Sequence, residues 1–359
     1  MSSLAFILDR SRVDRRLSST VEVLTSIWER VLQHSAIDDD ANFFDLGGDS
    51  ISAVQLFKEI AQVYRIKLPA FTICQTPTIS DLASLIDQRM PPHCPSRVLL
   101  KSGDIGPPIF MLHGLGGSIL ELCGVARHIR CRNPIYGMQM RGINCGEEPF
   151  QRVEDMARFH LTVIKELQPR GPYILIGYSL GGLVMFEMAR RFSEEGEKVR
   201  LLGMVDSYPH RRFLPTLERL RLAVHLVRRR AFRLTHREPE NATGFTEGSA
   251  LALQMSCGSE DRKCSGAELD STFNQAIGCL RNRASIALKN YRPPYYHGKI
   301  NFVRAQTPSW FPKNADTVWG HLAKHLHVDT VPGDHLGMLT RHSQSLAAVL
   351  SRYIEESVC

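Results

Sequence analysis

Ser179 stands in a local sequence that is typical of a catalytic nucleophile. It lies within GYSLGG at 177–182, directly after the apolar run 173–176 and before a helical pattern. A G-x-S-x-G sequence between a strand and a helix forms a sharp turn, the nucleophile elbow, which exposes the serine hydroxyl. The helix N-terminus behind this turn favours developing negative charge. We therefore predict that Ser179 is a nucleophile, in preference to a serine that only caps the helix.

A serine hydroxyl becomes a nucleophile beside a base, and the base needs an acid that orients it. On sheets with such an elbow the chain order is serine, acid, histidine. His335 is the predicted base, because it lies in a loop at the carboxyl end of the strand expected at 327–331. Asp206 is the predicted acid, because it ends the apolar run 199–205 and would lie on the same edge as Ser179.

Other residues compete for these two roles. Asp329 and Asp334 remain alternatives for the acid, although Asp334 adjoins His335 in the chain, where reaching Nδ1 is awkward. We expect the remaining histidines to be solvated or packed: His321, His325 and His327 in or near a helical stretch, and His297 before a strand.

Two backbone N–H groups are expected to stabilise the oxyanion that forms when Ser179 attacks a carbonyl. One belongs to Leu180, the residue after the nucleophile. The other belongs to the loop HGLGG at 113–117, in which we choose Leu115 as the donor. His113 is interpreted as a hydrogen-bonding residue that holds this loop, not as a second base.

Ser50 lies in a second dense motif, FFDLGGDSI at 43–51. Two glycines and Asp49 place it at the start of a helix, among acidic side chains. No general base stands next to it, which makes it a poor nucleophile. The residue types alone leave two possibilities open, a helix N-cap and a site of covalent modification.

An acidic helical unit surrounds Ser50. Apolar residues recur at helical spacing over 21–34, from Ser50 onward and from 78 onward, and three short helices can share one small core. Residues 20–90 contain ten acidic and five basic side chains, whereas the whole chain has a net charge of +7. The acidic unit is therefore expected to attract the basic remainder.

The remainder of the chain predicts an α/β fold. A linker rich in proline and glycine covers 91–106, where 98–100 has the composition of an edge strand. Strands and helices then alternate, which is typical of a parallel sheet covered on both faces. Residues 207–296 interrupt this order and predict a helical lid. We expect strands at 109–112, 135–138, 173–176, 199–205, 299–303 and 327–331, and helices at 152–167, 179–193, 214–234, 247–256, 270–289 and 343–354.

Two resemblances give these motifs a common meaning. LGGDSI within residues 20–90 resembles the peptidyl or acyl carrier domains of nonribosomal peptide and polyketide synthases. This resemblance implies 4′-phosphopantetheine on Ser50, attached by a phosphopantetheinyl transferase. Residues 107–358 independently resemble the type I thioesterase domains that end such assembly lines, and that family places its acid where Asp206 lies. The matching pieces are PIFMLHG at 108–114, PIYG at 134–137, GPY at 171–173, GYSLGG at 177–182, VDS at 205–207 and GDH at 333–335.

The expected architecture is multi-domain, a small all-α helical bundle followed by an α/β-hydrolase fold with a helical lid insertion. Its parts are an N-terminal linker at 1–19, the carrier domain at 20–90, a linker at 91–106, and the thioesterase domain at 107–358 with the lid at about 207–296.

The two resemblances also imply a function. The chain would hold an acyl or peptidyl group as a thioester on Ser50 and release it through an acyl-Ser179 intermediate, by hydrolysis or cyclisation, in secondary-metabolite biosynthesis. Upstream acyl-activating or synthase modules would act in trans, unless the chain is a piece of a longer synthase. Two alternatives stay open: a carrier module with an editing thioesterase, and a free serine esterase with a helical appendage.

Composition excludes several other classes. The chain is 43% hydrophobic and 23% charged, which is ordinary for a globular protein. It has no apolar run of about 18 residues, as a membrane helix requires, and its apolar stretch at 4–8 is too short for a signal peptide. Nine scattered cysteines without a CxxC favour free thiols in the cytoplasm over disulfides or a metal site. No nucleic-acid-binding motif occurs.

Two segments leave a choice between a functional and a structural role. Residues 211–237 contain nine arginines and one acid, Glu218, and predict a lid helix with a solvated face; the sharper hypothesis is that these arginines receive the acidic carrier. Trp310, Phe311 and Trp319 either line an acyl pocket or are buried in the core.

Overall fold

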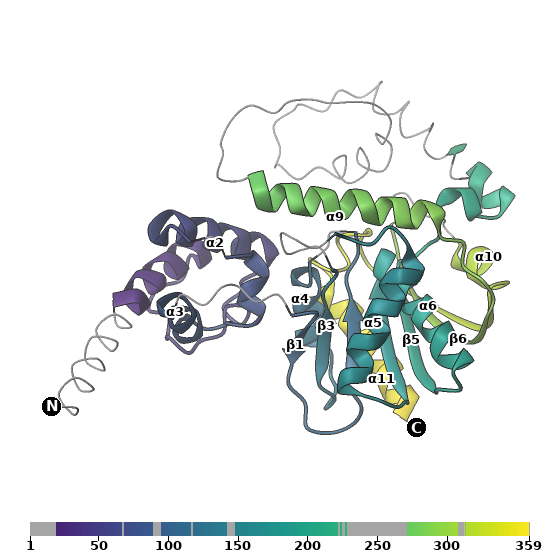
Figure 1. The fold of residues 1–359 in the computed structure, drawn as a ribbon, viewed down its shortest axis with the longest axis horizontal. Coiled ribbons are helices and arrows are strands. Elements are labelled where there is room, and N and C mark those ends of the chain that lie inside the picture. Colours follow the sequence, from purple (N-terminus) through teal and green to yellow (C-terminus); the bar gives the residue numbers. More distant parts are fainter. Residues whose placement is uncertain are drawn as a thin grey trace.

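The structure is a computed structural model in which a small helical unit lies beside a larger unit built on a sheet (Figure 1). It describes residues 19–66, 68–88, 95–115, 118–141, 148–221, 223–224, 227, 271–307, 312 and 314–358.

The N-terminal unit is a bundle of helices around one apolar core. Trp28 and Phe43 are fully buried at its centre, and their rings meet edge to face with centroids 5.1 Å apart. The three predicted helices are confirmed, and a 3₁₀ helix lies between the second and the third. The elements are a helix over 19–32, α2 (Ser50–Tyr64), η1 (Ala70–Cys74) and α3 (Ile79–Asp87).

The second unit contains a seven-stranded sheet in the order β1-β3-β2-β4-β5-β6-β7. Only β1 is antiparallel to its neighbour, and the other pairs are parallel. The central strands β2 and β4 are buried along their whole length, which explains their unbroken apolar sequence. The strands are β1 (Arg97–Lys101), β2 (Ile109–Leu112), β3 (Ile135–Met138), β4 (Tyr173–Tyr178), β5 (Val199–Val205), β6 (Tyr296–Ala305) and β7 (Ala323–Val331).

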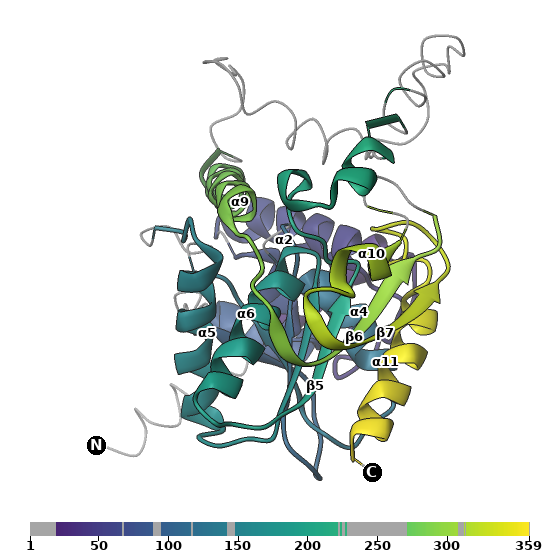
Figure 2. The ribbon, with the colours of Figure 1, turned by 90° about the vertical axis from the view of Figure 1, so that its right-hand side faces the viewer.

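Helices cover both faces of this sheet (Figure 2). One core cluster joins residues of α5 (Val153–Leu167), α6 (Leu180–Glu194), α9 (Ser271–Asn290) and α10 (Ala315–Trp319). The opposite cluster joins residues of α4 (Leu120–His128) and α11 (Ser343–Val358).

The structure differs from the predicted elements in several places. The sequence pattern did not predict α4 or α10. His325 and His327 lie on β7, so the helical surroundings expected for them are wrong, and His297 lies within β6 rather than before it. Strand β1 confirms the edge strand expected at 98–100, although it lies inside the range assigned to a linker, so the sheet begins ten positions after α3 ends at Asp87.

Part of the predicted lid is described. The 3₁₀ helix η2 (Arg211–Phe213) and a helix over 216–221 follow β5, and α9 confirms the helix expected at 270–289. Figure 1 shows α9 lying across the sheet-containing unit. The helix expected at 247–256 lies outside the described residues, as do most of 222–237 and the aromatic pair Trp310 and Phe311.

Buried Glu187 joins α6 to the end of α9. Its carboxylate accepts hydrogen bonds from Arg190, Arg191 and, at 3.1 Å, the hydroxyl of Tyr291. Burial opposes ionisation, but the two arginines outweigh it, so the pKa of Glu187 lies below its ordinary value. This stabilisation is therefore present above the ordinary carboxyl pKa and is lost as the pH falls through the lowered one.

Glu187→Ala is expected to lower the free energy of unfolding by about 1–3 kcal/mol, because it leaves the buried Tyr291 hydroxyl without its acceptor and removes the carboxylate shared by Arg190 and Arg191. Urea denaturation measures this change. Glu194→Ala is the matched control, because Glu194 pairs with the same Arg190 but its side chain is 60% exposed; its cost should be below about 1 kcal/mol. Equal losses in the two variants would contradict the prediction.

Candidate active site

Ser179 occupies a strained turn between β4 and α6. Its backbone angles are φ 54° and ψ −120°, and a positive φ is unusual for any residue other than glycine. The backbone N–H donates to the Val205 carbonyl at 2.9 Å, which fixes the turn against β5. A Cβ at Gly177 or Gly181 would collide with backbone atoms, so the motif's glycines are required by close approach.

His335 and Asp206 lie beside Ser179, as the sequence predicts. The Ser179 hydroxyl is 3.2 Å from His335 Nε2, and His335 Nδ1 is 2.7 Å from Asp206 Oδ2. Asp206 is 4% exposed, follows β5 and has a positive φ of 44°. Its Oδ1 also accepts the Ala305 N–H at 3.3 Å, which holds the carboxylate toward the ring.

Tyr178 holds His335 in place through its ring and its hydroxyl. The two rings stack with centroids 4.7 Å apart, and the Tyr178 hydroxyl donates to the His335 carbonyl at 2.8 Å. Burial raises the pKa of Tyr178 well above its ordinary value, so the hydroxyl stays a donor. Tyr178 occupies a variable position of the elbow motif, and no local sequence signal marks this contact, because His335 lies 157 positions away.

The loop after β2 approaches Ser179 closely. A Cβ at Gly114 would lie 3.0 Å from the Ser179 Cβ, so this position favours glycine. Leu115 follows in the same loop, and Leu180 is the first residue of α6. His113 is fully buried, pairs through Nδ1 with the Gly114 carbonyl at 2.8 Å, and has a pKa lowered by burial to about 4. A neutral ring that holds the loop agrees with its predicted structural role.

The competing residues lie elsewhere. Asp329 pairs with His327, Arg352 and the Tyr353 hydroxyl on the outer strand β7, and Asp334 accepts the Gly337 N–H within its own loop. Trp319 is fully buried against the sheet and donates to the Ser207 carbonyl at 3.0 Å, which is the core position foreseen as its alternative.

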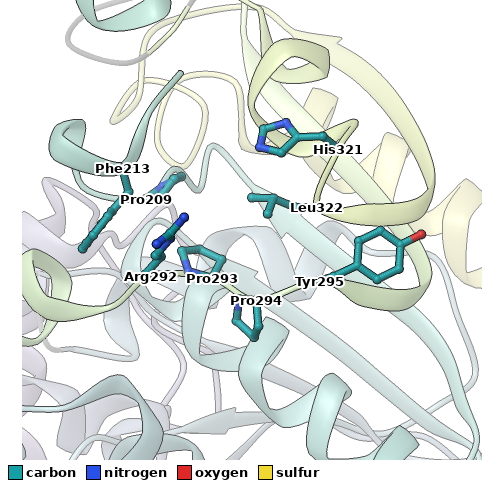
Figure 3. A pocket seen from close by; sticks show the side chains of 8 residues that line it. All are labelled: Pro209, Phe213, Arg292, Pro293, Pro294, Tyr295, His321 and Leu322. Carbon is teal, nitrogen blue, oxygen red and sulfur yellow. The ribbon is translucent and has the colours of Figure 1, made fainter. Parts of the chain in front are cut away.

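A separate cavity of about 470 Å³ opens beyond Pro209 (Figure 3). Prolines and aromatic rings dominate its wall, and none of Ser179, Asp206 and His335 lines it. We therefore assign it no part in chemistry at the serine. Its lining residues are Pro209, Phe213, Arg292, Pro293, Pro294, Tyr295, His321 and Leu322.

Glu121 is a charged neighbour of the site that sequence reasoning missed. It lies in the first turn of α4. Burial raises the pKa of Glu121 to about 7, although Arg281, His335 and a backbone hydrogen bond from Gly114 favour the charged carboxylate. No local motif marks it, because α4 itself was not predicted. The Glu121 carboxyl therefore changes its charge near neutral pH, and it lies close enough to His335 to interact with it electrostatically.

Glu121→Gln is expected to flatten the pH dependence of turnover near pH 7. Above about pH 7 the native carboxylate is negative and favours the imidazolium that His335 becomes on taking a proton. The variant should be several-fold slower than the native chain on the alkaline side and match it on the acidic side. Steady-state kcat/KM measured across this range tests the prediction, with Glu154→Gln as control. An unchanged profile in Glu121→Gln would refute it.

The second half of the Ser50 motif, residues 45–49, forms a surface turn before α2. Asp49 caps the helix by accepting the backbone N–H groups of Ile51 and Ser52 at 3.0 and 2.8 Å, so Ser50 is not needed as the cap. Gly47 has a φ of 88°, which the turn requires. Ile51 and Val54 are 71% and 56% exposed on the same helix. An attachment point on a surface turn beside apolar side chains fits a phosphopantetheine arm.

Two features are absent among the described residues. No helix among them combines the length and the apolar character needed to cross a bilayer. The described part of the chain also holds no group of three or more histidine, cysteine, aspartate or glutamate side chains suited to a metal ion.

Comparison with protein families finds two matches. Residues 107–355 match the model of the thioesterase domain, and residues 22–86 match the model of the phosphopantetheine attachment site. The first match contains Ser179, Asp206 and His335, and the second contains Ser50.

The chain is also similar to parts of much longer proteins. It is 32% identical over 295 residues to a dimodular nonribosomal peptide synthase of Bacillus subtilis, which covers 81% of this chain and 12% of that protein. It is 34% identical over 205 residues to an indigoidine synthase of Streptomyces lavendulae, covering 56% of this chain and 16% of the other. The chain thus spans less than a fifth of the length of these relatives.

Solved structures share the fold. A four-domain nonribosomal peptide synthetase, bound to AMP and glycine, aligns with 93% of this chain and 26% of its own, with a TM-score of 0.57 and 20% identity. The NocB thioesterase domain, solved as a covalent complex with a fluorophosphonate analogue of nocardicin G, aligns with 70% of this chain and 95% of its own, with a TM-score of 0.50 and 21% identity.

Proposed function

We propose, from the premise that this chain belongs to the thioesterase domain family and also carries a phosphopantetheine carrier domain, that it releases an acyl or peptidyl chain from its own carrier through Ser179. The single observation that supports this most is the continuous path of hydrogen bonds from the Ser179 hydroxyl through the His335 ring to the buried Asp206 carboxylate. This order is the one required to activate a serine and to stabilise the imidazolium that results.

The bonded groups suggest the course of the reaction. His335 Nε2 takes the Ser179 proton as the serine oxygen attacks the thioester carbonyl, and Asp206 stabilises the imidazolium through Nδ1–H. The N–H groups of Leu115 and Leu180 are proposed to hold the oxyanion, where the loss of one donor typically costs about 3–4 kcal/mol. His335 then returns the proton to the leaving thiol. Water, or a hydroxyl or amine of the acyl chain, next attacks the ester on Ser179 with His335 again as base, which gives a free acid or a ring.

Ser50 is the proposed attachment residue for the arm. Phosphopantetheine, when bound, supplies a terminal thiol that carries the acyl group as a thioester. We further propose the domain division stated from the sequence, with the carrier at 20–90 and the thioesterase at 107–358, except that β1 (Arg97–Lys101) takes part of the range 91–106 assigned to the linker into the sheet. The partners would be a phosphopantetheinyl transferase, which modifies Ser50, and acyl-activating or synthase modules, which load the chain in cis or in trans; release would serve secondary-metabolite biosynthesis.

Loading the chain with an acyl-coenzyme A and a permissive phosphopantetheinyl transferase tests the proposal. Intact-protein mass spectrometry should show one acyl-phosphopantetheine adduct that maps to Ser50 and then loses its acyl group with time. Ser50→Ala should gain no adduct, whereas Ser26→Ala, which removes an exposed hydroxyl bonded to its own helix, should behave like the native chain. An adduct elsewhere, or no adduct, would favour a free esterase with a helical appendage. Release confined to mismatched acyl groups would favour the editing role.

A further inference from the structure

The carrier unit contacts the thioesterase domain through one face of α4. Arg127 forms an ion pair with Asp45, donates to the Asn42 side chain at 3.0 Å and lies over the Phe44 ring at 5.6 Å. These three carrier residues lie within the loop that leads to Ser50. Arg127, and none of the lid arginines in the described range 211–221, supplies this contact.

Apolar packing extends the same interface. Val98 of β1, together with Ile119 and Leu120 at the start of α4, joins the buried cluster formed by the carrier's own core. All three side chains are at most 8% exposed. The contact therefore combines a desolvated apolar centre with a charged rim, the usual composition of a specific docking surface.

Two thiols from opposite sides meet inside this interface. Cys74 ends η1 of the carrier, Cys123 lies on α4, and their sulfur atoms are 2.8 Å apart. Cys123 is 3% exposed and Cys74 is partly buried. A disulfide bond measures 2.03–2.05 Å, so each sulfur has to move only about 0.4 Å to form one.

We propose that Cys74 and Cys123 form a reversible disulfide that fastens the carrier to the thioesterase domain. The consequence for turnover rests on the proposed function, because a carrier has to leave this surface to be loaded by other domains. A chain held by the bond would keep its folded domains but lose access to those partners.

A small-molecule disulfide such as oxidised glutathione balances the reaction. One cysteine thiolate attacks the reagent, forms a mixed disulfide and releases one glutathione thiolate. The second cysteine thiolate then attacks the protein sulfur of that mixed disulfide and releases the second glutathione. Two protein thiols are oxidised to one disulfide, the reagent is reduced to two thiols, and the cysteine protons pass to the released thiolates.

Burial controls how readily this happens. Desolvation in the interface, together with the neighbouring Cys123, raises the pKa of the Cys74 thiol, so Cys74 holds little of the reactive thiolate in the docked state. Cys123 is 3% exposed there and is shielded from the reagent. The first attack therefore depends on brief separation of the two surfaces, and redocking brings the second thiol onto the mixed disulfide. The two thiols are thus shielded from the reagent while the carrier is docked, and they form the disulfide when the carrier docks again after a brief separation.

Non-reducing peptide mapping of the full chain tests the bond. After oxidised glutathione and thiol alkylation, the intact chain should carry two alkyl groups fewer than the reduced and alkylated chain, and one linked peptide should join Cys74 to Cys123. Cys74→Ser and Cys123→Ser should lack this link, and Cys131→Ser, at a thiol directed to the Asn133 carbonyl, should keep it. Links to other cysteines only, or stable glutathione adducts without a link, would overturn the proposal.

Two further measurements separate the bond from its consequence. Arg127→Glu should lower the yield of the linked peptide, because it places like charges at Asp45, whereas Arg130→Glu should not; equal yields would contradict docking through α4. Oxidation should slow acyl transfer to Ser50 from a donor in trans, a reductant should restore it, and Cys123→Ser should respond to neither. If the disulfide-linked chain accepted acyl groups on Ser50 at the native rate, the bond would not restrict the carrier and this consequence would be refuted. The link itself is mapped without any activity at Ser50 or Ser179, so its failure is distinguishable from failure of the proposed function.

Discussion

Ser179→Ala is expected to reduce acyl release by about 10⁶-fold, because removal of the nucleophile of a serine triad removes the whole covalent route. The chain should still accept the arm and the acyl group on Ser50. Acylated carrier should therefore accumulate, and intact-protein mass spectrometry should show a persistent thioester. Rates of release from a loaded chain measure the effect directly.

Ser193→Ala is the matched control for this variant. Ser193 lies on the same helix α6, and its hydroxyl donates to the Ala189 carbonyl within the helix. Its release rate should equal the native rate. If Ser179→Ala released the acyl group at a native rate, the elbow serine would not be the nucleophile and the proposed reaction would fail.

Asp206→Asn is expected to lower kcat by about 10⁴-fold while leaving the fold intact. The carboxylate accepts from His335 Nδ1 at 2.7 Å and from the Ala305 N–H at 3.3 Å. An amide oxygen held by Ala305 would turn the amide NH₂ group toward the ring and force the imidazole into the tautomer with the proton on Nε2. That tautomer cannot take the proton of Ser179.

Asp329→Asn tests the alternative acid under the same assay. Asp329 lies on β7, bonded to Arg352 and Tyr353, so its replacement should affect stability more than chemistry. Single-turnover release from acylated Ser50 should be near native in this variant. A larger loss of release in Asp329→Asn than in Asp206→Asn would reverse the assignment of the acid.

The sequence was most informative where burial is continuous and local. Strands β2, β3 and β5 have the predicted bounds, because each is a short apolar run between turns and is covered on both faces. Ser179, Asp206 and His335 could be placed together for a related reason: each follows a parallel strand, and the carboxyl ends of parallel strands share one edge.

The elements that the sequence missed lack such signals. Helix α4 begins at Leu120 after Ile119, whose side chain makes no cap hydrogen bond, and it contains Gly124, which lowers helix propensity. Along β7 polar and apolar residues alternate on a half-exposed outer strand, where surface histidines obscure the pattern. Contacts such as Tyr178 with His335 and Cys74 with Cys123 join positions far apart in the chain and have no local pattern at all.

The short connection between α3 and β1 limits how far the carrier can travel. Asp87 and Arg97 are ten positions apart, so even a fully extended chain spans at most about 35 Å between them. A connection of this length keeps the carrier at a millimolar effective concentration around its own thioesterase domain. Delivery of the acyl group from the carrier to Ser179 should therefore be a first-order event within one molecule. Its rate should not change on dilution, and a free carrier added at micromolar concentration should compete poorly.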